Sequence, residues 1–326
     1  MTPTDLKNSS PNRHPIRGYL FIASAAFCWG VSATLGRAAF TGRLFGSGQA
    51  LPPIDPLILA QSRTTISLLV LAPFLLAIRG WTGMRLPQRD FRRAMVIGVL
   101  GVAASNYFYY LAIQKTNVAT AIILQYTAPV WVLLYMVARR LQKATAQRVA
   151  AVGLALVGIA LVIDVFGGTG LRINRVGVVA AMLASLSFAC YNIFGGQLVQ
   201  QYDRWKALAY VLLGTVTFWL IVNPPWKVLA THYSGRQWGF LAIFSITSVL
   251  LPFSLYFSGL HHLDPTRAII TSCLEPVFSI AITALALGEL VGRTQIAGMV
   301  LVLAATLMVQ MPERNAPRAV AVEPIE

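Results

Sequence analysis

Residues 109–130 read YYLAIQKTNVATAIILQYTAPV, and residues 256–277 read YFSGLHHLDPTRAIITSCLEPV. The two stretches align without a gap at a shift of 147 residues, which places Tyr109 on Tyr256 and Pro129 on Pro276. The same shift lays VAAVGLALVG, which begins at Val149, over IAGMVLVLAA, which begins at Ile296. The unbroken register with matching Tyr and Pro indicates that the chain contains an internal repeat.

The start of the repeat aligns at a different shift. GYLFIASAAFCWG, from Gly18, lies over GVVAAMLASLSFA, from Gly177, at a shift of 159 residues. The first half therefore carries about 12 extra residues, which we place in the Gly- and Pro-rich loop TGRLFGSGQALPPID at residues 41–55. We expect this loop to be an external excursion, either a flexible lid or a tolerated insertion.

The composition is that of a membrane protein. Of the 326 residues, 56% are hydrophobic and only 11% are charged, which lies well outside the balance of a soluble domain. A membrane-spanning helix needs roughly 20 mostly apolar residues. Ten segments of the chain meet this requirement: Gly18–Phe40, Pro56–Ile78, Ala94–Ile113, Val118–Val137, Val149–Ile163, Val176–Val199, Ala207–Val222, Trp238–Leu260, Ala268–Leu287 and Gln295–Met311.

Five helices per repeat is an odd number, so the second repeat enters the membrane from the side opposite to the first. We therefore predict an all-α integral membrane protein with ten transmembrane helices in two inverted five-helix repeats, residues 18–163 and 176–311. The flanking segments 1–17 and 312–326 are predicted to be tails, the second polar and disordered. Inverted repeats recur in secondary transporters because they give one chain two conformations that open to opposite sides of the membrane.

The net charge of +15 is distributed unevenly. If the N-terminus is cytoplasmic, the tails and even-numbered loops hold 17 Lys and Arg residues, against 8 for the odd-numbered loops counted with Arg37. This asymmetry predicts that both termini are cytoplasmic. The membrane is then expected to be the plasma membrane, which in a bacterium is the inner membrane. The basic clusters also suit anionic lipid, and nucleic-acid binding is not expected.

Two charged residues, Arg63 and Glu275, fall well inside predicted helices, whereas Arg37 lies close to the end of its segment. A carboxylate such as Glu275 is costly in a bilayer unless it is paired, protonated or facing water, so it is either a proton-coupling or substrate-amine site or a neutral acid bonded to a neighbouring helix. Arg63 could hold a substrate carboxylate, snorkel to the external headgroups or pair with a helix carbonyl. Together, the two charges would suit a zwitterion such as an amino acid.

Other candidates are apolar or neutral. Pro129 and Pro276 occupy equivalent mid-helix positions, where each removes a backbone hydrogen bond and is predicted to kink its helix. Aromatic and amide side chains could line a small-molecule cavity between helices, or pack as ordinary core residues. The residues chosen for this role are Tyr256, Gln125, Asn106 and Trp29.

Five short motifs occur in order on the predicted helices: AAFCWG at residues 25–30, DPLILAQSR ending at Arg63, TAPV at 127–130, LEPV at 274–277 and LGE at 287–289. With the two five-helix repeats, they resemble the EamA family of the drug/metabolite transporter (DMT) superfamily. The resemblance implies a ten-helix permease, often an exporter of amino acids or other small metabolites. The chain departs from the family where Gln142 stands, since the family often has an acidic residue at this position, which aligns with Glu289.

The leading hypothesis is a secondary transporter of a small polar metabolite, with protons as a coupling ion and no cofactor. One alternative is a membrane-embedded enzyme that uses Glu275, or His261 and Asp264 of the HHLD stretch. Another is a scaffold that transports nothing. The sequence lacks the G-x-S-x-G, H-E-x-x-H and Walker A motifs, and its cysteines have no metal-ligand spacing. The oligomeric state is left open, with a homodimer as one option.

Overall fold

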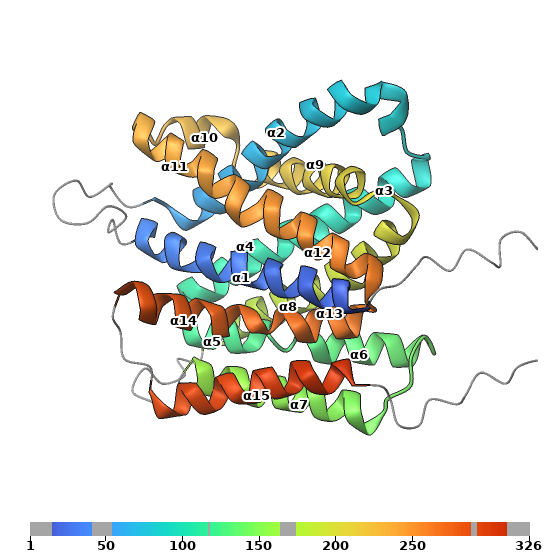
Figure 1. Cartoon of the computed structure of the whole chain (residues 1–326). Helices are drawn as coiled ribbons and strands as arrows, with labels where there is room; N and C mark the ends of the chain where they lie inside the picture. The colour runs from blue at the N-terminus through green and yellow to red at the C-terminus, as the bar shows by residue number, and fades with distance from the viewer. Residues whose placement is uncertain (1–14, 41–53, 117, 164–173, 288–291, 312–326) are drawn as a thin grey trace, which may run out of the picture.

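The computed structural model describes residues 15–40, 54–116, 118–163, 174–287 and 292–311, and every regular element in these ranges is helical (Figure 1). The predicted tails, most of the first loop and Glu289 of the LGE motif lie outside the described residues. The elements are α1 Pro15–Phe40, α2 Pro56–Met84, α3 Gln88–Val96, η1 Ile97–Ala103, α4 Ala104–Lys115, α5 Val118–Gln125, α6 Ala128–Ala138, α7 Ala146–Val162, α8 Arg175–Gln201, α9 Arg204–Val222, α10 Pro225–Leu229, α11 Gly235–Ser245, η2 Ile246–Leu250, α12 Leu251–His262, α13 Pro265–Ser272, α14 Leu274–Leu287 and α15 Arg293–Gln310.

The helices form a bundle whose long members run back and forth between the left and right ends of the view in Figure 1. Within the described ranges, seven helices are long and apolar enough to cross a membrane, and Ala146–Val162 is a shorter apolar helix. Each of the ten apolar segments predicted from the sequence falls, to within one residue, inside one helix or one run of consecutive helices. The first residues of α1 and the last residues of α15 lie at the same end of the bundle.

Several helices begin at an acidic residue. Asp55 accepts hydrogen bonds from the backbone N–H groups of Leu57 and Ile58 at 2.8 and 3.1 Å. Asp203 caps α9 and Asp264 caps α13 in the same way. Such a cap stabilises a helix by roughly 0.5–2 kcal/mol, because it satisfies N–H groups that have no partner within the helix.

Two pairs of helix irregularities occur at equivalent places in the sequence. The π-helical segments η1 and η2 end at Ala103 and Leu250, which the shift of 147 residues superimposes. The run α5–α6 is interrupted at Tyr126 and Thr127, and the run α13–α14 is interrupted at Cys273, which aligns with Tyr126. The predicted kinks are therefore complete interruptions, and each lies just before a proline.

Helix α8 lies at the centre, where it packs against α4, α5, α6, α12 and η1. Its small residues Ala181, Ser185 and Ala189, spaced four apart on one face, are all buried, as close helix packing requires. At one edge of the bundle, α7 and α15 lie side by side (Figure 1). A Cβ added to Gly158 would lie 2.9 Å from the carbonyl oxygen of Gly298, so the two backbones are nearly in contact.

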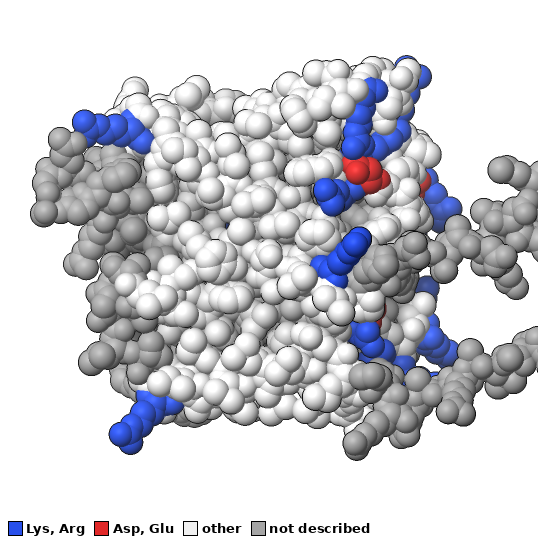
Figure 2. Space-filling model, in the orientation of Figure 1, with Lys and Arg blue, Asp and Glu red and all other residues white. Residues whose placement is uncertain are grey.

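The charged side chains gather at the ends of the bundle and leave an uncharged band between them (Figure 2). More Lys and Arg side chains lie at the end where α2 gives way to α3 than at the opposite end. We call this the cation-rich end. The helix ends that meet there carry Arg17, Arg79, Arg85, Arg89, Arg92, Arg93, Arg139, Arg140, Lys143, Arg148, Arg204, Lys206 and Arg267.

Candidate functional site

Glu275 lies in the first turn of α14, directly after the interruption at Cys273, and its side chain is half-buried. The other carboxylates among the described residues lie at helix starts near the ends of the bundle: Asp55, Asp90, Asp203 and Asp264. Of the acidic side chains that the structure describes, Glu275 is therefore the one that lies near the middle of a helical run, here α13–α14.

Tyr126 is a hydrogen-bonding partner of Glu275. Its hydroxyl, at the interruption between α5 and α6, donates to the Glu275 carboxylate. Thr127, at the same interruption, lies 2.9 Å from the Ser185 hydroxyl on α8. The interrupted helices thus bring a phenol from the first half of the chain to a carboxylate from the second half.

Arg63 projects from α2 toward α4. Its Nη2 donates to Oδ1 of Asn106 at 2.7 Å, and Asn106 in turn donates to the Val102 carbonyl at 2.9 Å. The Nε of Arg63 is buried and has no hydrogen-bond partner. This pairing with an amide side chain was not among the possibilities considered for Arg63, which were a substrate carboxylate, snorkelling and a helix carbonyl.

Arg63 and Glu275 interact electrostatically, and Tyr109 lies within the field of both. No ion pair within 4.0 Å joins Arg63 and Glu275, although both residues belong to the described part of the chain. The structure thus brings Arg63, Asn106, Tyr126 and Glu275 into one cluster, and its two opposite charges are not in contact.

The two prolines lie at the start of the second helix of each interrupted run. Pro129 and Pro276 are buried and cannot donate to the carbonyls four residues earlier, those of Gln125 and Ser272. Gln125 is the last residue of α5 and is half-buried. The prolines therefore shape the site by ending helices.

Tyr256 and Trp29 belong to an aromatic cluster between α1, α8 and α12. Tyr256 is fully buried and its hydroxyl donates to Asn192. The ring centroid of Trp29 lies 5.3 Å from that of Tyr256. Its neighbour Gly30 lies against α14, because a Cβ there would be 3.3 Å from the carbonyl oxygen of Glu275. Tyr256 is accordingly a core residue, whereas half-buried Trp29 lies at the edge of the Glu275 cluster.

The residues of the HHLD stretch have structural partners. His261 Nδ1 lies 3.1 Å from the Val199 carbonyl, and Asp264 both caps α13 and forms an ion pair with Arg267 at 3.2 Å. No group of three or more His, Cys, Asp or Glu side chains that could hold a metal ion occurs among the described residues.

Sequence reasoning missed Tyr126 as the partner of Glu275 and Asn106 as the partner of Arg63. The signal for Tyr126 was present, because it lies three residues before Pro129 as Cys273 lies three residues before Pro276. Gln142, where the family often has an acid, accepts a hydrogen bond from the Thr266 hydroxyl at 2.8 Å.

Comparison with known proteins agrees with this architecture. A solved crystal structure superposes with a TM-score of 0.69 over 89% of this chain and 95% of its own, at 18% identity, and so shares the fold. The uncharacterized inner membrane transporter YicL of Salmonella typhimurium is 24% identical over 71% of this chain and 77% of its own length. The uncharacterized transporter YcbK of Bacillus subtilis is 23% identical over 64% of this chain and 69% of its own.

A family model matches the chain twice. The EamA-like transporter family matches residues 16–164 and again residues 175–311, which together are most of the chain. The chain thus belongs to the EamA-like transporter family, and it is a multi-pass integral membrane transporter.

Proposed function

We propose that the protein is a secondary transporter that moves a small, amino-acid-like metabolite by alternating access of ten transmembrane helices in two inverted repeats. The observation that carries this proposal is the cluster of Arg63, Asn106, Tyr126 and Glu275, in which two opposite charges lie close enough to interact electrostatically without forming an ion pair. The direction we propose is export out of the cell, which follows from the family resemblance.

Contacts between the two halves support the inverted repeats of residues 18–163 and 176–311. A Cβ on Gly18 would lie 2.6 Å from Leu263, and a Cβ on Gly177 would lie 2.4 Å from Thr116. The repeat alignment places Gly18 on Gly177, at the shift of 159 residues, and Thr116 on Leu263, at the shift of 147 residues. The two contacts are therefore equivalent, with the two halves of the chain exchanged. An exchange of this kind is expected when two copies of one unit are related by a two-fold axis in the membrane plane.

A second pair of contacts exchanges in the same way. The Ser67 hydroxyl on α2 donates to the Ser245 carbonyl on α11 at 3.0 Å. The shift of 147 residues places Ser67 on Gly214 and Gly98 on Ser245. Gly98 and Gly214 are also in contact, since a Cβ on Gly98 would lie 2.9 Å from the Cα of Gly214. The double match of the family model supports the same assignment.

We assign the cation-rich end to the cytoplasm. Loops that stay in the cytoplasm are enriched in Lys and Arg, and both α1 and α15 have their outer ends at this face (Figures 1 and 2). On this assignment the N- and C-terminal tails are cytoplasmic, and the protein is an inner or plasma membrane protein.

The equivalent helices α13 and α5 differ in burial, which supports alternating access. In α13, near the cation-rich end, Thr266 and residues 268–272 are all buried. In α5, near the opposite end, residues 122–125 are half-buried. Unequal burial of two equivalent helices is expected when a transporter occupies one of its two states. The state described here would be the one closed toward the cytoplasm.

Cysteine labelling tests this assignment with a matched pair of variants. Gln125→Cys and Ser272→Cys occupy equivalent positions, one half-buried and one buried. In a background whose native cysteines are replaced, Gln125→Cys should react with a membrane-impermeant maleimide from outside, and Ser272→Cys should be protected. Equal labelling of both cysteines throughout the transport cycle would contradict alternating access.

The transport function itself is tested by counterflow in proteoliposomes. A carrier should accumulate labelled substrate against an excess of unlabelled substrate inside, with saturable kinetics. The substrates tried first are amino acids that stabilise the purified protein. A chemically altered substrate would favour the enzyme alternative, and neither flux nor conversion would favour a scaffold.

In this assay, Arg63→Ala should weaken recognition of the substrate carboxylate. Losing a charge-assisted hydrogen bond corresponds to an increase in KM of about tenfold or more. The decarboxylated amine of the same substrate should be transported equally by both proteins. Arg89→Ala, at an exposed position of the cation-rich end, is the control. An unchanged KM for the amino acid in Arg63→Ala would refute the carboxylate contact.

A further inference from the structure

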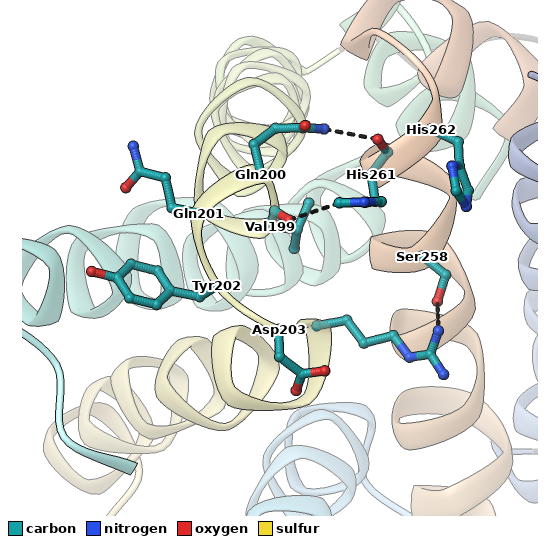
Figure 3. Close-up of a pocket in the computed structure, with 9 residues that line it drawn as sticks. Val199, Gln200, Gln201, Tyr202, Asp203, Ser258, His261 and His262 are labelled. Carbon is teal, nitrogen blue, oxygen red and sulfur yellow. Dashed lines mark hydrogen bonds between the residues drawn. The ribbon is translucent and has the colours of Figure 1, made fainter. Parts of the chain in front are cut away.

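A pocket of about 330 Å³ lies at the cation-rich end, apart from the Glu275 cluster (Figure 3). It is enclosed by the end of α8, the start of α9 and the end of α12. Its lining residues are Val199, Gln200, Gln201, Tyr202, Asp203, Arg204, Ser258, His261 and His262. Each of the three helices is long and apolar enough to span a membrane, or belongs to such a run, so the pocket lies at the level of lipid headgroups.

The basic side chains of the pocket are held in place by neighbouring groups. Arg204 donates to the Ser258 hydroxyl at 3.1 Å and lies over the Trp205 ring, 5.6 Å from its centroid. His261 Nδ1 must donate to the Val199 carbonyl, which can only accept, so its Nε2 remains for another partner. His262 stacks on Phe21 of α1.

The acidic and phenolic groups of the pocket are engaged elsewhere. Asp203 forms an ion pair with Arg79 at 2.9 Å and caps α9. The Tyr202 hydroxyl donates to Asp90 at 2.6 Å, and this hydrogen bond raises the pKa of Tyr202, so that the phenol stays neutral. The electrostatic balance of the pocket therefore favours an anion.

Further polar groups rigidify the pocket wall. The Gln200 amide donates to the carbonyls of Leu260 and His261, each at 3.0 Å, and so ties the end of α8 to the end of α12. A guanidinium has five N–H donors in a planar fork that matches the oxygens of a phosphate group. With a liquid volume of about 30 Å³ per water, the pocket has room for a phosphate group and several waters.

We propose that this pocket binds a phosphate group through Arg204, Ser258 and His261. Basic pockets between transmembrane helices at the cytoplasmic face are suited to phosphate headgroups of anionic lipids, and a free phosphate would be recognised by the same chemistry. The site shares no residue with the Glu275 cluster.

Thermal unfolding of the purified full-length protein tests the proposal and separates the two sources. One arm adds sodium phosphate to the protein in detergent, with sodium chloride at equal ionic strength as reference. The other arm compares nanodiscs of phosphatidylcholine with nanodiscs of an equal mixture of phosphatidylcholine and phosphatidylglycerol. A higher unfolding temperature in the first arm identifies soluble phosphate, and one in the second arm identifies a lipid headgroup. No shift in either arm would overturn the proposal.

Substitutions then localise the effect. Arg204→Gln should weaken the apparent affinity for the active ligand about tenfold or more. His261→Gln, which keeps a donor for Val199, should weaken it as well and provides a second variant if Arg204→Gln does not fold. Arg89→Gln removes the same charge from an exposed position at the same end and should respond like the wild type. Equal losses in Arg204→Gln and Arg89→Gln would reduce the effect to general surface charge and refute the site.

Discussion

Glu275→Gln should reduce proton-driven flux to the level of empty liposomes while the protein remains folded. Glutamine keeps the size of the side chain and can still accept a hydrogen bond from Tyr126, but it cannot take up or release a proton. The other described acids, Asp55, Asp90, Asp203 and Asp264, stand at helix starts near the ends of the bundle, so none of them is positioned to replace Glu275. The measurement is substrate flux in proteoliposomes under an imposed pH gradient.

The same variant separates two roles of Glu275. If the carboxylate couples transport to protons, exchange of labelled for unlabelled substrate without a gradient should continue in Glu275→Gln. If it binds the substrate amine, exchange should be lost as well. Asp90→Asn, which removes an acid at the cation-rich end, is the control and should keep proton-driven flux. An unaltered pH dependence in Glu275→Gln would remove its coupling role.

Gly98→Ala should destabilise the protein by about 3 kcal/mol, a large change for a single methyl group. A Cβ on Gly98 would lie 2.2 Å from the carbonyl oxygen of Val211 and 2.8 Å from the backbone nitrogen of Thr215. Both are backbone atoms of α9, so no side-chain rotation can relieve the contact. The two helices would have to separate, which would also strain the hydrogen bond from the Thr215 hydroxyl to the Gly98 carbonyl, 3.1 Å long.

Gly153→Ala is the matched control for this substitution. Gly153 is exposed on α7, and an added Cβ would have no neighbour within 4 Å. Alanine is favoured over glycine in a helix by about 1 kcal/mol, so this variant should be as stable as the wild type or more stable. Denaturant titration of both variants in the same detergent gives the comparison. Equal stabilities would mean that α9 and η1 are not in close contact.

The helical architecture could be predicted from the sequence because it depends on local properties. An apolar run of sufficient length must be helical in a bilayer, where backbone groups have no water to bond with. The interruptions before Pro129 and Pro276 could be anticipated for the same reason, since proline lacks the N–H that would continue the helix. The π-helical segments η1 and η2 could not, because their residues are as apolar as the helices around them.

The candidate site was predictable in its charges but not in its pairings. Glu275 and Arg63 were visible as ionisable residues in apolar surroundings. Their partners Tyr126 and Asn106 come from other helices, and which side chains meet depends on helix rotation and tilt. Tyr256 was chosen as a possible site residue from its side-chain type alone, and the structure places it in the core, bonded to Asn192.

The equivalence of Ala128 and Glu275 limits the stoichiometry of coupling. The alignment that pairs Pro129 with Pro276 also pairs Ala128 with Glu275. The two repeats together therefore supply one acid at this position, whereas two identical repeats would supply two. Coupling through Glu275 would thus exchange one proton for each substrate molecule. When the substrate is a zwitterion without net charge, each cycle moves one elementary charge, and a membrane potential of 100 mV contributes about 2.3 kcal/mol to it. Export would then respond to voltage as well as to the pH gradient.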